Sequence, residues 1–147
     1  MILIESVFVA ASGCEFTHAS EVDRTGIKVA VSGNASADVF LSRTLKSAQI
    51  VRVGGDTASV LDVLRSGKAD VYATLSENAS VIAERLPGAK IIPGVFNTVG
   101  FAVAMPKGRS SAAQTRLAQI VNDAKAAGIV QKAIERSDLK GVRVAPD

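Results

Sequence analysis

A strand pattern followed by a helix pattern recurs three times in the middle of this 147-residue chain. Short apolar, β-branched runs at residues 27–33, 48–55 and 69–74 each precede a segment whose apolar residues recur at helical spacing. A fourth short strand is predicted at 89–94. Successive strand–helix units require right-handed crossovers. The pattern therefore predicts an α/β fold, a mostly parallel sheet with helices on both faces.

Turn and capping residues punctuate these units. Ser36, Asp56 and Ser76 stand where each of the three helices is expected to begin, and each is a favourable N-cap residue type. Gly67 is expected to end the second helix, and a Pro-Gly pair at 87–88 the third.

Longer apolar segments flank the units. Residues 2–11 are predicted to form a strand, and residues 97–108 a longer one. Ser110 or Ser111 is expected to cap a long helix, with a shorter helix after Gly128. We divide the chain into a crossing strand and loop (1–26), an α/β lobe (27–94), and a return strand with C-terminal helices (95–147).

Composition excludes several classes of function. Hydrophobic residues make up 48% and aromatic residues only 4%, which argues for an aliphatic core and against a base-stacking nucleic-acid module. The net charge of +3 is scattered rather than clustered, so we expect no nucleic-acid partner. Cys14 and His18 are the only residues of their types, so we expect no disulfide, metal site or cofactor.

The opening "MILIESVFVAASGC" raises the possibility of a lipoprotein signal ending at Cys14. No positive charge follows Met1, however, and Glu5 interrupts the apolar run, which is not typical of such a signal. We expect a strand here and no credible signal peptide. The chain is then cytoplasmic as encoded, or a fragment of an exported protein.

Three stretches together resemble the second lobe of bacterial extracellular (periplasmic) solute-binding proteins of ABC importers, the type that binds amino acids. They are "EVDRTGIKVAVSGNASADVFLSRTL", "VLDVLRSGKADVYAT" and "GFAVAMPKGRSSA". The resemblance implies that residues 1–26 correspond to the strand crossing between two lobes. It also implies a truncated solute-binding protein, an ABC permease as partner, and a function outside the cytoplasm.

The first candidate site is the turn "SGNAS", Ser32, Gly33, Asn34, Ala35 and Ser36. It joins the carboxyl end of a strand to a helix N-terminus, where free N–H groups favour an anion. The resemblance implies that Ser36 binds a ligand carboxylate and that Asn34 makes a left-handed turn. Helix capping and turn formation alone explain the same residues equally well.

The second candidate site follows the third strand at Leu75, Ser76 and Glu77. The resemblance places at Leu75 an aspartate that pairs with a ligand ammonium, and leucine cannot do so. An α-amino acid is therefore not the expected ligand unless Glu77 supplies the charge. The simpler role of Glu77 is an acid in the first helical turn.

Two alternatives to solute binding remain. One is a non-enzymatic oligomer, because the C-terminal helices present an apolar face that would favour association of copies of the chain; its residues are Leu117, Ile120, Val121, Ile129 and Ile134. The other is an enzyme resembling prephenate or arogenate dehydratases, for which Glu77 is the one plausible general acid. We expect no enzymatic activity.

Overall fold

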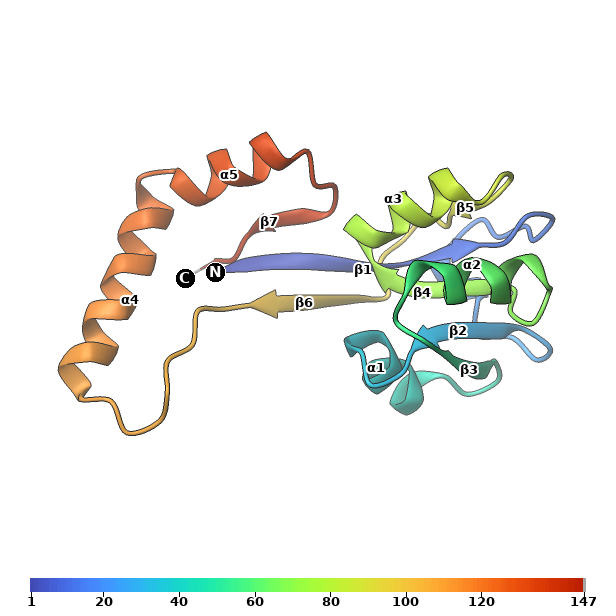
Figure 1. Ribbon diagram of the computed structural model, residues 1–147, viewed down its shortest axis with the longest axis horizontal. Helices are drawn as coiled ribbons and strands as arrows, with labels where there is room; N and C mark the ends of the chain where they lie inside the picture. The colour runs from blue at the N-terminus through green and yellow to red at the C-terminus, as the bar shows by residue number, and fades with distance from the viewer. Residues whose placement is uncertain (147) are drawn as a thin grey trace. The chain divides into compact units, whose positions relative to one another are not determined.

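The computed structural model describes residues 1–146 and contains two compact units (Figure 1). The larger unit is Glu5–Thr98, and the smaller one combines Met1–Ile4 with the chain from Val99 onward. The elements are β1 (Ile2–Ala10), the 3₁₀ helix η1 (Ala19–Glu21), β2 (Lys28–Ser32), α1 (Ser36–Thr44), β3 (Gln49–Val53), α2 (Thr57–Arg65), β4 (Val71–Leu75), α3 (Ser76–Arg85), β5 (Lys90–Ile91), β6 (Asn97–Phe101), α4 (Ser111–Ala126), α5 (Ile129–Ser137) and β7 (Val142–Val144).

The sheet has the strand order β3-β2-β4-β1-β5, and β6 and β7 also pair with β1. Strand β2 is parallel to both β3 and β4, whereas β1 runs antiparallel to β4, β5 and β7. The parallel part of the sheet thus corresponds to the three predicted strand–helix units. Strand β1 reaches β2 through a loop rather than a crossover helix, which leaves it free to enter antiparallel.

Helices cover both faces of the sheet in the larger unit. The step from β2 to β3 runs toward one edge of the sheet, and the step from β3 to β4 runs back. Right-handed crossovers therefore place α1 and α2 on opposite faces. Helix α3 connects β4 to β5, a step in the same direction across the sheet as the step from β3 to β4. It therefore lies on the same face as α2 and packs beside it (Figure 1).

Alternating side chains of the strands form two separate cores. On the α1 face Val29 and Val31 pack with Leu41, and on the α2/α3 face Ala30 packs with Val60 and Ile82; all are buried. The cores are aliphatic and alanine-rich, and Phe8 and Tyr72 are their buried aromatic side chains. The α/β fold with a sheet between helices is confirmed. The sheet is mixed rather than mostly parallel, because β1 runs antiparallel to β4, β5 and β7.

Two predicted caps are wrong. Helix α1 begins at Ser36 itself and has Ala35 as its N-cap, and α3 begins at Ser76 with Leu75 as its N-cap. Neither N-cap residue caps its helix with a side-chain hydrogen bond. Asp56, in contrast, accepts a hydrogen bond of 2.9 Å from the Ser59 N–H and caps α2, as predicted.

The smaller unit contains α4, α5, β7 and the outer parts of β1 and β6. Ser110 caps α4 by accepting from the Ala113 N–H at 3.3 Å, and Gly128, at φ 70°, separates the two helices. The predicted strand 97–108 is too long, because β6 ends at Phe101. The Met1 amino group donates a hydrogen bond to the carbonyl of Phe101, the last residue of β6.

No residue of α4 or α5 is buried in the part of the chain that the structure describes. Ile120 is 51% exposed and Ile129 60% exposed. A groove of about 320 Å³ in this unit is lined by apolar side chains, including Met105, Leu117 and Val121. Among residues 1–146, no helix has the length and apolar character needed to cross a bilayer.

Candidate functional site

Three turns meet at one edge of the sheet in the larger unit. Because β2, β3 and β4 are parallel neighbours, their carboxyl ends lie side by side and each leads into a helix. The two sequence-predicted groups, Ser32–Ser36 and Leu75–Glu77, therefore share this edge. The third turn, between β3 and α2, carries the capping Asp56.

Asn34 shapes the first turn. It has a φ of 61°, the left-handed conformation predicted for it, and the Ala35 N–H donates to the Ser32 carbonyl at 3.1 Å. The Gly33 N–H donates to the Val53 carbonyl of the neighbouring strand. Ser36 is exposed in the first turn of α1, where N–H groups have no intrahelical acceptor. Its hydroxyl and these N–H groups can receive an anion.

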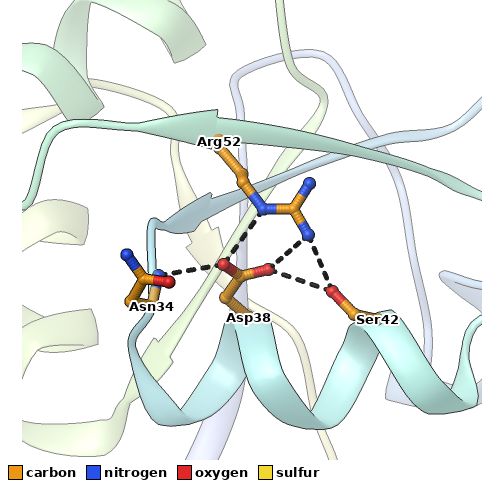
Figure 2. Close-up of polar contacts among 4 residues, drawn as sticks. All are labelled: Asn34, Asp38, Ser42 and Arg52. Atoms are coloured by element: carbon orange, nitrogen blue, oxygen red, sulfur yellow. Dashed lines mark hydrogen bonds and ion pairs between the residues drawn. The ribbon is translucent and has the colours of Figure 1, made fainter.

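A buried carboxylate, missed by the sequence analysis, organises this turn (Figure 2). Asp38 accepts a hydrogen bond from the Asn34 N–H at 2.9 Å and one from the Ser42 hydroxyl at 3.0 Å. Arg52 of β3 donates to both carboxylate oxygens, from Nε at 3.0 Å and from the terminal nitrogen at 2.9 Å. Asp38 thus holds the turn that a capping serine was expected to hold.

The electrostatics of Asp38 follow from these contacts. Hydrogen bonds from Arg52 and from the Asn34 N–H hold the pKa of the carboxyl below its usual range, against the opposing effect of burial. The side chain of Asp38 is 8% exposed and that of Arg52 57%. The pair is neutral as a whole, so it does not cancel the positive end of the α1 dipole.

The carboxyl end of β4 carries two unsatisfied polar atoms nearby. Glu77 is half-buried, and its Oε2 is enclosed without a hydrogen-bond partner among the described residues. Ser6, directly opposite Leu75 on the antiparallel β1, is fully buried, and its Oγ also lacks a partner. An enclosed carboxylate oxygen favours a donor group, which a ligand can provide. Ser6 is not among the site residues predicted from the sequence.

A hydrogen bond holds the first candidate turn to the neighbouring strand β4. Ser32 Oγ and the Tyr72 hydroxyl are 3.0 Å apart, which joins the carboxyl end of β2 to the first half of β4 on the α2/α3 face. The Ser32 side chain is therefore engaged within the sheet. Leu75 is half-buried and supplies no charge to the edge.

No protein-family model matches the sequence, and no curated protein does either. Solved structures are similar: a mutant of the arginine-binding protein ArgBP from T. maritima (TM-score 0.69, 21% identity, 91% of this chain and 57% of that chain) and the solute receptor for L-cysteine of Neisseria gonorrhoeae (0.69, 17%, 92% and 54%). An ancestral cyclohexadienyl dehydratase is also similar (0.55, 21%, 91% and 56%).

These likenesses show a periplasmic-binding-protein-like fold, in agreement with the sequence resemblance. The chain spans little more than half the length of each of these structures.

Proposed function

We propose that the chain is a solute-binding lobe that takes a small carboxylate-bearing solute at the edge formed by Ser32–Ser36 and Leu75–Glu77, as part of a solute-binding protein that delivers its ligand to an ABC permease. The observation that carries the proposal is that the exposed first turn of α1 and the Glu77 carboxylate follow neighbouring parallel strands at the same carboxyl edge. This is where ligands bind in open α/β sheets.

Each side of the edge favours a different part of a ligand. The N-terminus of α1 and the Ser36 hydroxyl favour a carboxylate. Glu77, with one enclosed and unpartnered oxygen, favours a hydrogen-bond donor. The similar structures include receptors named for arginine and for L-cysteine, which supports small-molecule binding. Because Leu75 carries no charge, we do not expect an ammonium group of the ligand to contribute much to affinity.

Titration of the ¹⁵N-labelled chain by NMR tests the proposal, with L-arginine, L-cysteine and L-glutamine, and with the same compounds lacking the carboxylate. We expect weak, saturable shifts at Asn34 to Ala37 that need the carboxylate, because one lobe encloses only part of a ligand. Glu77→Gln is expected to weaken binding, whereas Glu84→Gln, exposed on the same helix, is the matched control. Shifts independent of the carboxylate would overturn the assignment of the α1 turn.

A second candidate function is a non-enzymatic oligomer that reuses the lobe. It is supported by α4 and α5, which have no buried residue in the described chain although they carry an apolar face. That face comprises Leu117, Ile120, Val121, Ile129 and Ile134.

Light scattering across a concentration series tests the oligomer. We expect a homodimer or larger species that Ile120→Ser weakens, with Val39→Ser, a similarly exposed position on α1, as control. A monomer at all concentrations would exclude this role.

An enzymatic role of the dehydratase type is the remaining alternative, and the likeness to an ancestral cyclohexadienyl dehydratase supports testing it. Glu77 would have to act as general acid. We expect no turnover of prephenate by the chain. Turnover that Glu77→Gln abolishes and Glu84→Gln preserves would replace the binding proposal with catalysis at the same edge.

A further inference from the structure

The outer edge of β3 is an open strand edge. Strand β3 pairs with β2 and with no other strand that the structure describes. The Gln49 N–H donates to the Ile27 carbonyl, and the Val53 carbonyl accepts from the Gly33 N–H. Residues 49, 51 and 53 therefore direct their peptide groups toward β2, so Ile50 and Arg52 direct theirs outward. Outward N–H and C=O groups are a template for one more strand.

A groove of about 710 Å³ lies beside this edge. Val51 and Val53 of β3 and Val63 of α2 contribute apolar side chains to its wall. Its charged lining residues are Arg52, Arg65, Lys68 and Asp62, all exposed. The groove therefore combines backbone hydrogen-bonding groups, an apolar wall and an excess of positive charge.

The charges of the groove differ in how far they are already engaged. Arg52 donates to Asp38 and Ser42, so its guanidinium is drawn over α1 rather than across the edge (Figure 2). Arg65 donates to a neutral backbone carbonyl, and neither Arg65 nor Lys68 has a carboxylate partner within ion-pair distance in the described chain. Besides Arg52, the groove lining thus includes two cations without a carboxylate partner among the described residues and one carboxylate, that of Asp62.

We propose that the edge of β3 binds an extended acidic segment of another protein, which adds as a strand and directs alternate acidic side chains toward Arg65 and Lys68. Main-chain hydrogen bonds provide affinity in strand addition, and alternate side chains provide specificity. A second copy of this chain is a poorer occupant, because it brings the same two cations to the same groove. The proposal is independent of the solute site at the carboxyl edge.

The probe is an acetylated, amidated heptapeptide in which glutamate alternates with threonine. Titrated into the ¹⁵N-labelled full chain, it is expected to shift the Ile50 and Arg52 amides saturably. The glutamine version of the peptide is expected to bind more weakly. Two further versions of the peptide are N-methylated, one at the odd-numbered and one at the even-numbered residues. They separate backbone pairing from charge, because only the version methylated at the N–H groups that point toward β3 is expected to lose binding.

Matched variants locate the charge contribution. Neutralising Arg65 and Lys68 together by glutamine is expected to weaken binding about 5–10-fold, on the scale of two exposed ion pairs. The control is Lys90→Gln with Lys132→Gln, which changes net charge equally at exposed positions outside the groove.

Three results overturn the proposal: no peptide binding, equal losses in the two double variants, or edge shifts that grow with protein concentration alone, which would assign the edge to a second copy.

Discussion

Removing the hydroxyl of Tyr72 tests how firmly the turn after β2 is held to the neighbouring strand β4. Tyr72 is 6% exposed, and its ring belongs to the core on the α2/α3 face, so Tyr72→Phe retains the packing and removes only the hydroxyl. Its partner, Ser32 Oγ at 3.0 Å, is half-buried at the end of β2. The change therefore isolates one neutral hydrogen bond between neighbouring strands.

The expected effect is a loss of about 1 kcal/mol in the free energy of unfolding, the usual net contribution of such a bond. Ser32→Ala is expected to cost a similar amount. The double variant is expected to be little less stable than either single variant, which gives a coupling energy of about 1 kcal/mol. For a chain of this length each single change corresponds to a melting temperature lower by roughly 3 °C.

Urea denaturation of the four proteins, followed by circular dichroism, measures the cycle. Tyr72 is the only tyrosine and the chain has no tryptophan, so tyrosine fluorescence reports on this site in the wild type and in Ser32→Ala. Hydrogen exchange at the Val31 and Ala73 amides, which lie in paired strands, shows whether the loss is local. Strict additivity of the single changes, or a neutral Tyr72→Phe, would refute the claim that this bond holds the turn to β4.

Further predictions concern acid stability and two glycines. The folded-state pKa of Asp38 is lowered, so its ionised form stabilises the fold above the ordinary aspartate range near pH 4, and this contribution is lost as the pH falls through the folded value. Asp38→Asn is expected to lower the melting temperature at pH 7 and to flatten its decline between pH 5 and 3. Gly94→Ala is expected to destabilise the chain by at least about 1 kcal/mol more than Gly26→Ala in urea. Both glycines have positive φ, but only a Cβ at Gly94 meets the His18 ring, at 2.7 Å. Equal losses would show that backbone conformation alone accounts for the effect.

The sheet and its helices follow from patterns that sequence carries locally. The alternation in "IKVAVSG" places Val29 and Val31 on one face and Ala30 on the other, as the two cores show. The length of β6 does not follow in the same way. The apolar run to residue 105 has a strand pattern throughout, but a strand also needs a paired neighbour, and β6 ends at Phe101.

The capping of α1 shows a second limit of sequence reasoning. Serine before an apolar stripe indicates an N-cap, and this pattern predicts Ser36 as the N-cap of the helix. Asp38 stabilises the turn before the helix instead, because its carboxylate accepts a hydrogen bond from the Asn34 N–H. An acid in the first turn of the predicted helix was a visible signal. Its partner Arg52 comes from another strand, and only the tertiary structure places the two together.

The unsatisfied Ser6 Oγ, opposite the carboxyl end of β4, had no signal in the sequence. A serine in an apolar strand, such as Ser6, is ordinarily assigned to a hydrogen bond with backbone or water. Its isolation opposite Leu75 depends on which strand β1 pairs with and in which register. By contrast, the leucine at position 75, where the family resemblance implies an aspartate, is visible in the sequence. It makes Glu77 the candidate acid at this edge.

Arg52 links the two surfaces for which a role is proposed. At an edge strand, a charged side chain commonly protects the open backbone from pairing. Here Asp38 draws the guanidinium onto α1, which has two consequences. The carboxylate in the first turn is neutralised, so the N-terminus of α1 keeps its preference for an anion. The outward peptide groups of β3 are also left uncovered by the nearest charged side chain.

Asp38→Asn would therefore alter both surfaces at once: it would weaken the turn at Asn34 and free Arg52 to cover the edge. If the two proposals are right, this single change reduces carboxylate-dependent shifts at Asn34 and changes peptide binding at Ile50, whereas Ser42→Ala, which leaves the ion pair in place, has the smaller effect on both.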